Sequence, residues 1–115
     1  LEVFLKRTRE DRVMDEQIVF GTDIYFDYDT LLLVNQNNPL QLTQKEADLF
    51  RYLIQNKNAV LKREDILINV WGKDDYFLGR SMDVFMTKVR KYIKDIKGLE
   101  LQTIHGVGFK LIFEQ

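Results

Sequence analysis

The feature that most constrains the fold is an apolar stripe at helical spacing in the second half of the chain. The stripe consists of Met82, Phe85, Met86, Val89, Ile93 and Ile96. Residues three and four apart share one face of an α-helix, so the stripe predicts a helix from about Ser81 to Ile96 with a buried inner face. The outer face of that helix would carry Arg80, Val84, Thr87, Lys88, Lys91 and Lys94.

Two shorter helices are predicted before this one. Thr43 and Glu46 form a capping box that opens the first, and its apolar residues share one face. The second starts near Arg63 and stops at Gly72, because a glycine commonly ends a helix. Residues 73–79 are expected to form a loop before the long helix.

Strands are predicted on both sides of the helices. Residues 18–42 alternate apolar and polar side chains between turn signals, which is typical of four short antiparallel strands. Near the C-terminus, Leu99–His105 and Phe109–Phe113 are β-like runs joined by Gly106-Val107-Gly108, whose glycines permit a tight reversal. The order is four strands, three helices and one hairpin, an α+β fold.

Charge is distributed unevenly along the 115 residues, although the net charge is only −1. Residues 80–97 contain six basic and two acidic side chains, whereas residues 1–42 carry an excess of acids. Nucleic-acid binding requires a local patch of basic side chains and does not require a positive net charge for the whole chain. The second and third predicted helices therefore read as a helix-turn-helix, with the third able to enter a major groove and the hairpin beside it as a wing.

Composition argues against other classes. The chain has no cysteine and one histidine, so thiolate metal sites and cysteine nucleophiles are excluded and no cofactor is expected. No phosphate-binding loop occurs, the carboxylates are scattered, and an enzyme is not expected. No apolar run is long enough to span a membrane. The absence of cysteine fits a cytoplasmic protein. The chain begins with Leu1, so we expect a fragment of a longer protein.

Several motifs together resemble the OmpR/PhoB-type effector domain of bacterial response regulators, across residues 40–112. They are Leu42-Thr43 with Glu46, Val70-Trp71-Gly72, Arg80-Ser81-Met82-Asp83-Val84, Val89-Arg90-Lys91, and Thr103-Ile104-His105-Gly106-Val107-Gly108-Phe109. Their spacing matches the family throughout. Four positions depart from it: His105 replaces the usual wing Arg, Phe109 a Tyr, Phe85 a frequent His, and Lys62 a Ser or Thr cap.

The resemblance implies a winged helix-turn-helix at residues 18–115, made of an N-terminal sheet (18–42), three helices (43–97) and a wing hairpin (99–115). Residues 1–17 would be the linker and tail of a phosphorylatable receiver domain absent from this chain. The implied function is a sequence-specific transcriptional regulator, the output domain of a two-component system and its phosphorelay. The implied partners are double-stranded promoter DNA with direct repeats, RNA polymerase, a sensor histidine kinase and a second copy in a head-to-tail homodimer.

The resemblance and the helical faces together give two sets of candidate site residues. The predicted DNA contacts are Trp71, Arg80, Ser81, Val84, Phe85, Thr87, Lys88, Arg90, Lys91, Lys94, Thr103, His105, Gly106 and Phe109. Val84, Thr87 and Lys88 are the side chains placed to reach base edges. The predicted polymerase-contact loop consists of Asp74, Asp75, Tyr76 and Phe77.

Structural alternatives stand beside these roles. Trp71 can serve core packing, and Asp83 can pair with Arg63 or Arg80. The aromatic pair Tyr76 and Phe77 can fold back onto the core. His105 can cap the hairpin without meeting DNA. The whole chain can be a winged-helix protein-interaction module without sequence-specific DNA binding, and salt-dependent retention on DNA would separate the two functions.

Overall fold

The computed structural model describes residues 17–114, which form parts of two compact units, Leu1–Thr43 and Gln44–Gln115. The expected linker and receiver tail at residues 1–17 lies outside the described residues, except for Gln17, where the first strand begins. Within the described part of the chain, no helix has the length and apolar character needed to cross a membrane.

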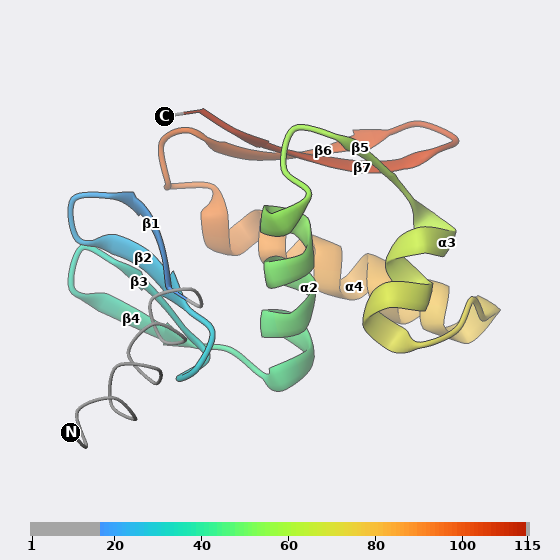
Figure 1. Ribbon diagram of the computed structural model, residues 1–115, viewed down its shortest axis with the longest axis horizontal. Coiled ribbons are helices and arrows are strands. Elements are labelled where there is room, and N and C mark those ends of the chain that lie inside the picture. The colour runs from blue at the N-terminus through green and yellow to red at the C-terminus, as the bar shows by residue number, and fades with distance from the viewer. Residues whose placement is uncertain (1–16, 115) are drawn as a thin grey trace, which may run out of the picture. The chain divides into compact units, whose positions relative to one another are not determined.

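The N-terminal unit is the predicted four-stranded antiparallel sheet (Figure 1, blue to cyan). Its strands are β1 (Gln17–Gly21), β2 (Ile24–Asp27), β3 (Leu32–Asn35) and β4 (Asn38–Gln41). Gln36 and Asn37 both have positive φ, as the tight turn of a two-residue hairpin requires. Pro39 lies in β4, at the edge of the sheet, where the missing N–H of a proline is tolerated.

The second unit contains the three predicted helices. They are α2 (Gln44–Gln55), α3 (Arg63–Ile66) with its continuation η1 (Leu67–Trp71), and α4 (Tyr76–Ile93). The residues of η1 form a π-helical turn, and Gly72, at a φ of 93°, ends the helix there. Leu53, Ile66 and Met82, one from each helix, are all fully buried, so the helices share a core.

A three-stranded antiparallel sheet completes this unit, in the order β5-β7-β6. The strands are β5 (Val60–Lys62), β6 (Leu99–Ile104) and β7 (Gly108–Phe113). The predicted hairpin is confirmed, and Figure 1 shows it with its turn on the side of α3. The strand β5 was not predicted from the sequence.

The predicted loop at residues 73–79 is wrong in its second half, because α4 begins at Tyr76 and not near Ser81. The Asp75 carboxylate caps the helix by accepting hydrogen bonds from the N–H groups of Phe77 (2.8 Å) and Leu78 (3.3 Å). Gly79, the last residue of the expected loop, is instead buried inside the helix, and a Cβ on it would lie 3.3 Å from Arg63 Nη2. The helix also ends earlier than expected, at Ile93.

The cap gives a prediction for stability. Asp75→Ala should lower the free energy of unfolding by about 1 kcal/mol, because two N–H groups at the start of α4 lose their acceptor. Its neighbour Asp74 is exposed and lies before the cap, so Asp74→Ala should change stability by less than about 0.5 kcal/mol. Urea unfolding of both variants measures the difference, and equal losses would rule out Asp75 as the cap.

Candidate nucleic-acid interface

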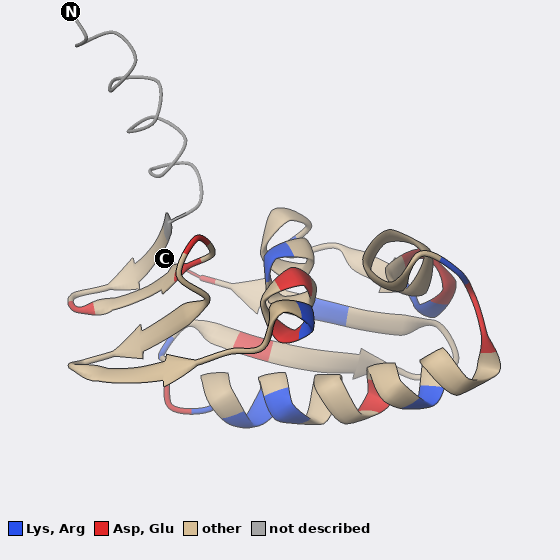
Figure 2. Ribbon diagram, turned by 90° about the horizontal axis from the view of Figure 1, so that it is seen from below, with Lys and Arg blue, Asp and Glu red and all other residues tan. Residues whose placement is uncertain are grey.

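Helix α4 separates a buried face from an exposed one, as predicted. Met82, Met86, Val89 and Ile93 are at most 2% exposed. The residues of the predicted outer face are all exposed: Arg80, Val84, Thr87, Lys88, Lys91 and Lys94. Figure 2 shows basic positions toward both ends of this helix. The exposed face therefore combines positive charge with two small side chains, those of Val84 and Thr87.

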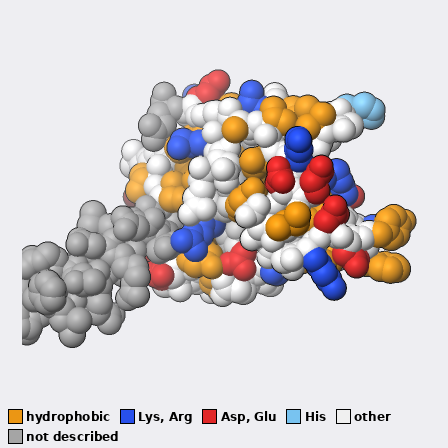
Figure 3. Space-filling model, turned by 45° about the vertical axis from the view of Figure 1, so that its right-hand side comes forward, with side chains coloured by type: hydrophobic (Ala, Val, Ile, Leu, Met, Phe, Trp, Pro, Cys, Tyr) orange, Lys and Arg blue, Asp and Glu red, His pale blue; other side chains and the backbone are white. Residues whose placement is uncertain are grey.

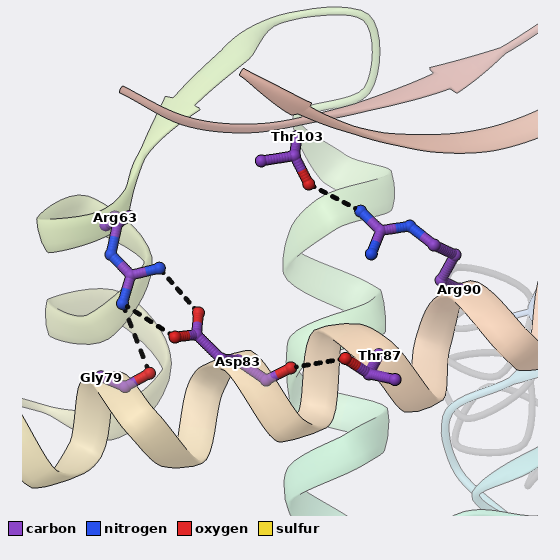
Figure 4. Close-up of polar contacts among 6 residues, drawn as sticks. All are labelled: Arg63, Gly79, Asp83, Thr87, Arg90 and Thr103. Carbon is purple, nitrogen blue, oxygen red and sulfur yellow. Dashed lines mark hydrogen bonds and ion pairs between the residues drawn. The ribbon is translucent and has the colours of Figure 1, made fainter. Parts of the chain in front are cut away.

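Arg63, at the start of α3, joins the hairpin turn to α4. Its Nη1 lies 2.7 Å from Asp83 Oδ1, and its Nη2 donates to the Gly79 carbonyl at 3.4 Å (Figure 4). Its backbone N–H donates to the Val107 carbonyl of the turn at 3.2 Å. Of the two arginines considered for Asp83, the partner is thus Arg63, and one residue fixes the hairpin turn relative to α4.

Arg90 forms a second connection between the same elements (Figure 4). Its Nε donates to the Leu101 carbonyl at 3.2 Å, and its Nη2 donates to Thr103 Oγ1 at 2.9 Å. Both Arg90 and Thr103 were predicted DNA contacts, and both are exposed. Their hydrogen bonds hold α4 against β6. Some of the N–H groups of the Arg90 guanidinium therefore already have acceptors within the protein.

An aromatic pair borders the outer face of α4. Trp71 and Phe85 are half-buried, with ring centroids 5.7 Å apart. Phe85 therefore lies outside the fully buried part of the predicted stripe. The Lys45 ammonium lies 5.6 Å from the Trp71 ring centroid and donates to the Val70 carbonyl at 2.9 Å. Trp71 thus contacts both Phe85 and Lys45 and remains partly exposed.

Lys88 has a partner that the sequence did not suggest. Its ammonium lies 3.7 Å from Oε2 of Glu46, a residue of α2 that is only 4% exposed, and 5.4 Å from the Phe85 ring centroid. The Tyr92 hydroxyl donates to the same carboxylate oxygen at 3.1 Å. Burial, followed by this hydrogen bond and the charge of Glu46, raises the pKa of the Tyr92 phenol above its ordinary value.

One signal in the sequence could have identified Glu46. It lies four residues before Phe50 and seven before Leu53, on the buried face of α2. An acid on such a face needs a partner, because burying an unpaired charge is costly. The capping-box reading of the same residue hid this signal.

The hairpin turn contains residues 105–107, and His105 there is exposed. Gly106, at a φ of 74°, supplies the backbone conformation of the turn. Gly108 serves a different purpose from the one expected, since it belongs to β7 and a Cβ on it would lie 1.9 Å from the Leu61 carbonyl oxygen. Phe109, also a predicted DNA contact, is 6% exposed, so its side chain belongs to the core.

The beginning of α4 carries an exposed aromatic tip, Tyr76 and Phe77. Their side chains are 72% and 75% exposed, and their rings meet edge to face at 5.5 Å. Arg80 Nη1 donates to the Tyr76 hydroxyl at 3.4 Å. Figure 3 shows hydrophobic side chains projecting from one end of the molecule. The alternative that both rings fold back onto the core is therefore wrong.

Comparison with known proteins assigns a family. Residues 37–111 match the family model described as transcriptional regulatory protein, C terminal. The transcriptional regulatory protein RprY of Bacteroides fragilis is 36% identical over 112 residues, which cover 97% of this chain and 48% of RprY. The chain spans about half the length of the curated relatives it matches.

Solved structures of similar fold are also found. The DNA-binding domain of Bacillus subtilis CssR is 33% identical, with a TM-score of 0.63 over 73% of this chain and 93% of that one. The DNA-binding domain of Klebsiella pneumoniae RstA, solved in complex with the RstA box, has a TM-score of 0.68 at 21% identity. That match covers 84% of this chain and 97% of the RstA chain. The likeness to RstA concerns the fold alone.

Proposed function

The chain belongs to the family of C-terminal domains of transcriptional regulatory proteins, and from this premise we propose that α4 enters the major groove of DNA and that the β6–β7 turn approaches the neighbouring minor groove. Its class is that of DNA-binding transcription regulators of the winged-helix, OmpR/PhoB type, which are not enzymes.

One observation carries the proposal: the exposed basic face of α4 lies beside a hairpin turn to which Arg63 links it directly. Phosphates are to be met by the cations Arg80, Lys91 and Lys94, and base edges by Val84, Thr87 and Lys88. The proposed major-groove contacts are Arg80, Ser81, Val84, Thr87, Lys88, Lys91 and Lys94, with the Trp71 indole N–H at a flanking phosphate and the Phe85 ring beside it. Thr103, His105 and Gly106 are proposed for the minor groove, whereas Arg90 serves mainly to hold α4 and β6 together.

Selection of bound duplexes from random-sequence DNA tests this function. A sequence-specific regulator should enrich one short motif over successive rounds, since specific binding exceeds non-specific binding by at least about a thousandfold. Binding without any enriched motif would contradict sequence-specific recognition. No binding to any duplex would favour a protein-interaction module instead.

The relatives support a proposal about the wider setting of this chain. The curated matches include proteins named response regulators, such as ArlR of Staphylococcus epidermidis, and the chain covers about half of each. We propose that this chain is the output domain, residues 18–115, of such a regulator in the cytoplasm, with residues 1–17 leading from a phosphorylatable receiver domain. A sensor histidine kinase would act on the receiver, and two copies would bind direct repeats head to tail.

The aromatic tip is proposed as the contact with RNA polymerase. Exposed aromatic side chains are frequent hot spots at protein interfaces, and Asp74 nearby would repel phosphates. Tyr76→Ala should weaken polymerase binding to the DNA-bound chain about thirtyfold, the equivalent of ~2 kcal/mol. The affinity for DNA should change by less than about twofold, because the aromatic tip is proposed to contact the polymerase and not the DNA.

Surface plasmon resonance of polymerase over a duplex carrying the bound chain measures this effect. Ile68→Ala is the matched control, since Ile68 is also an exposed apolar residue, at 52%, and lies on η1. Similar losses of polymerase binding in both variants, or loss of DNA binding in Tyr76→Ala, would refute the proposal.

His105 gives a prediction for the minor groove. His105→Arg should lower the dissociation constant about fivefold, or ~1 kcal/mol, because a guanidinium is longer than an imidazole, always charged and favoured by narrow A·T-rich grooves. His105→Asn serves as the uncharged control. If the arginine variant binds the selected duplex no better than the wild-type chain, the turn does not reach the groove.

A further inference from the structure

The cluster of Glu46, Lys88 and Tyr92 lies on the proposed DNA-binding side of the unit, yet its central residue is buried. The side chain of Glu46 is 5% exposed, and its Oε2 has the Lys88 ammonium at 3.7 Å and the Tyr92 hydroxyl at 3.1 Å. Lys88 and Tyr92 are four residues apart and therefore share one face of α4. A buried carboxylate of α2 thus draws on two side chains of the proposed recognition helix.

Two attractions hold the Lys88 ammonium close to the protein. One is the Glu46 carboxylate, and the other is the face of the Phe85 ring at 5.4 Å. The side chain of Lys88 remains 48% exposed, so DNA can still reach it. Lys91 is exposed and, within the described part of the chain, has no ion pair. The two lysines are therefore in different electrostatic situations on one helix.

We propose that Glu46 is a positioning residue for sequence specificity, which it exerts by keeping the Lys88 ammonium away from the DNA phosphates. The inference rests on the proposed function. Phosphate contacts raise affinity for all sequences alike, whereas contacts to base edges discriminate between them. The lysine ammonium sits on a flexible four-carbon chain, so it can reach a phosphate on DNA of many different sequences. Paired with Glu46, it contributes to the preference for certain bases and little to general affinity.

The salt dependence of binding to random-sequence duplex DNA tests this directly. Each cation that neutralises a phosphate contributes about 0.9 to the slope of log affinity against log salt. Glu46→Gln keeps an acceptor for Tyr92 but releases Lys88, so the slope should steepen by about 0.9. The ratio of dissociation constants for scrambled and selected duplexes should fall about fivefold, because general affinity rises more than specific affinity.

A double variant separates this effect from a disturbed core. Glu46→Gln with Lys88→Met removes both charges of the pair, a replacement that is often neutral or stabilising. Its slope should equal that of the wild-type chain, while Lys91→Ala should flatten the slope by about 0.9. Tyr92→Phe removes the hydroxyl that donates to Glu46 and should change neither the slope nor the ratio.

Each result decides between the alternatives. An unchanged slope in Glu46→Gln, or a slope in the double variant as flat as in Lys91→Ala, would overturn the inference, since Lys88 would then already contact a phosphate in the wild-type chain. The slope of the double variant still tests the inference even if the Glu46→Gln variant alone fails to fold. Failure of the wild-type chain to bind any duplex would instead refute the proposed function.

Discussion

Gly108→Ala is expected to lower the free energy of unfolding by about 3 kcal/mol. The added Cβ would lie 1.9 Å from the Leu61 carbonyl oxygen and 3.0 Å from the Lys62 Cα, both of which belong to β5. Backbone atoms cannot move aside as the end of a flexible side chain can, so β5 and β7 must separate. Their pairing, Val60 with Lys110 through Lys62 with Gly108, would be lost in part.

Gly106→Ala is the matched control in the same hairpin. A Cβ at Gly106 would have no other atom within 4 Å, so only the positive φ of 74° disfavours alanine there. This backbone conformation should lower the free energy of unfolding by about 1 kcal/mol. Thermal unfolding of the two variants measures the difference, about 10 °C or more in Tm for a domain of this size. A smaller loss at Gly108 than at Gly106 would show that the close contact with β5 is not limiting.

DNA affinity is expected to fall about fortyfold when the salt concentration rises from about 50 to 200 mM. The exposed cations of the outer face that are placed to meet phosphates are Arg80, Lys91 and Lys94. Three neutralised phosphates give a slope of log affinity against log salt of about −2.7. Fluorescence anisotropy with a labelled duplex measures the slope. An affinity that does not change over this range would contradict binding through the outer face of α4.

Much of the fold could be predicted because the relevant patterns are local. The stripe from Met82 to Ile93 gave the inner face of α4, and alternation with turn signals gave the strands of the N-terminal sheet. The strand β5 could not be predicted in this way. It has only three residues, of which Leu61 alone is buried, and so short a strand shows no alternating pattern of apolar side chains. Its pairing with β7 depends on residues some fifty positions further along the chain.

The start of α4 was missed for a different reason. Intrinsic preference disfavours Gly79 within a helix, since glycine is less favourable there than alanine by about 1 kcal/mol. The end of the Arg63 side chain, which would lie 3.3 Å from a Cβ at Gly79, favours a residue without a side chain there, and the Asp75 cap fixes the helix start. Tertiary packing thus overrides the local preference.

The candidate site was predictable in its outline but not in its connections. The exposed face of α4 followed from helical spacing alone. The pairing of Lys88 with Glu46, and the contacts of Arg90 with Leu101 and Thr103, join residues that are distant in sequence. The structure was therefore needed to distinguish the cations that are available to DNA from those that are held by contacts within the protein.

Protection of a selected duplex from dimethyl sulfate is the most direct test of the proposed binding geometry, because this reagent methylates guanine N7 in the major groove and adenine N3 in the minor groove. With α4 in the major groove and the β6–β7 turn beside it, the bound chain should protect guanine N7 within one short stretch. Adenine N3 should be protected immediately next to that stretch. Protection confined to the minor groove, or none in either groove on a duplex that the chain demonstrably binds, would contradict the account.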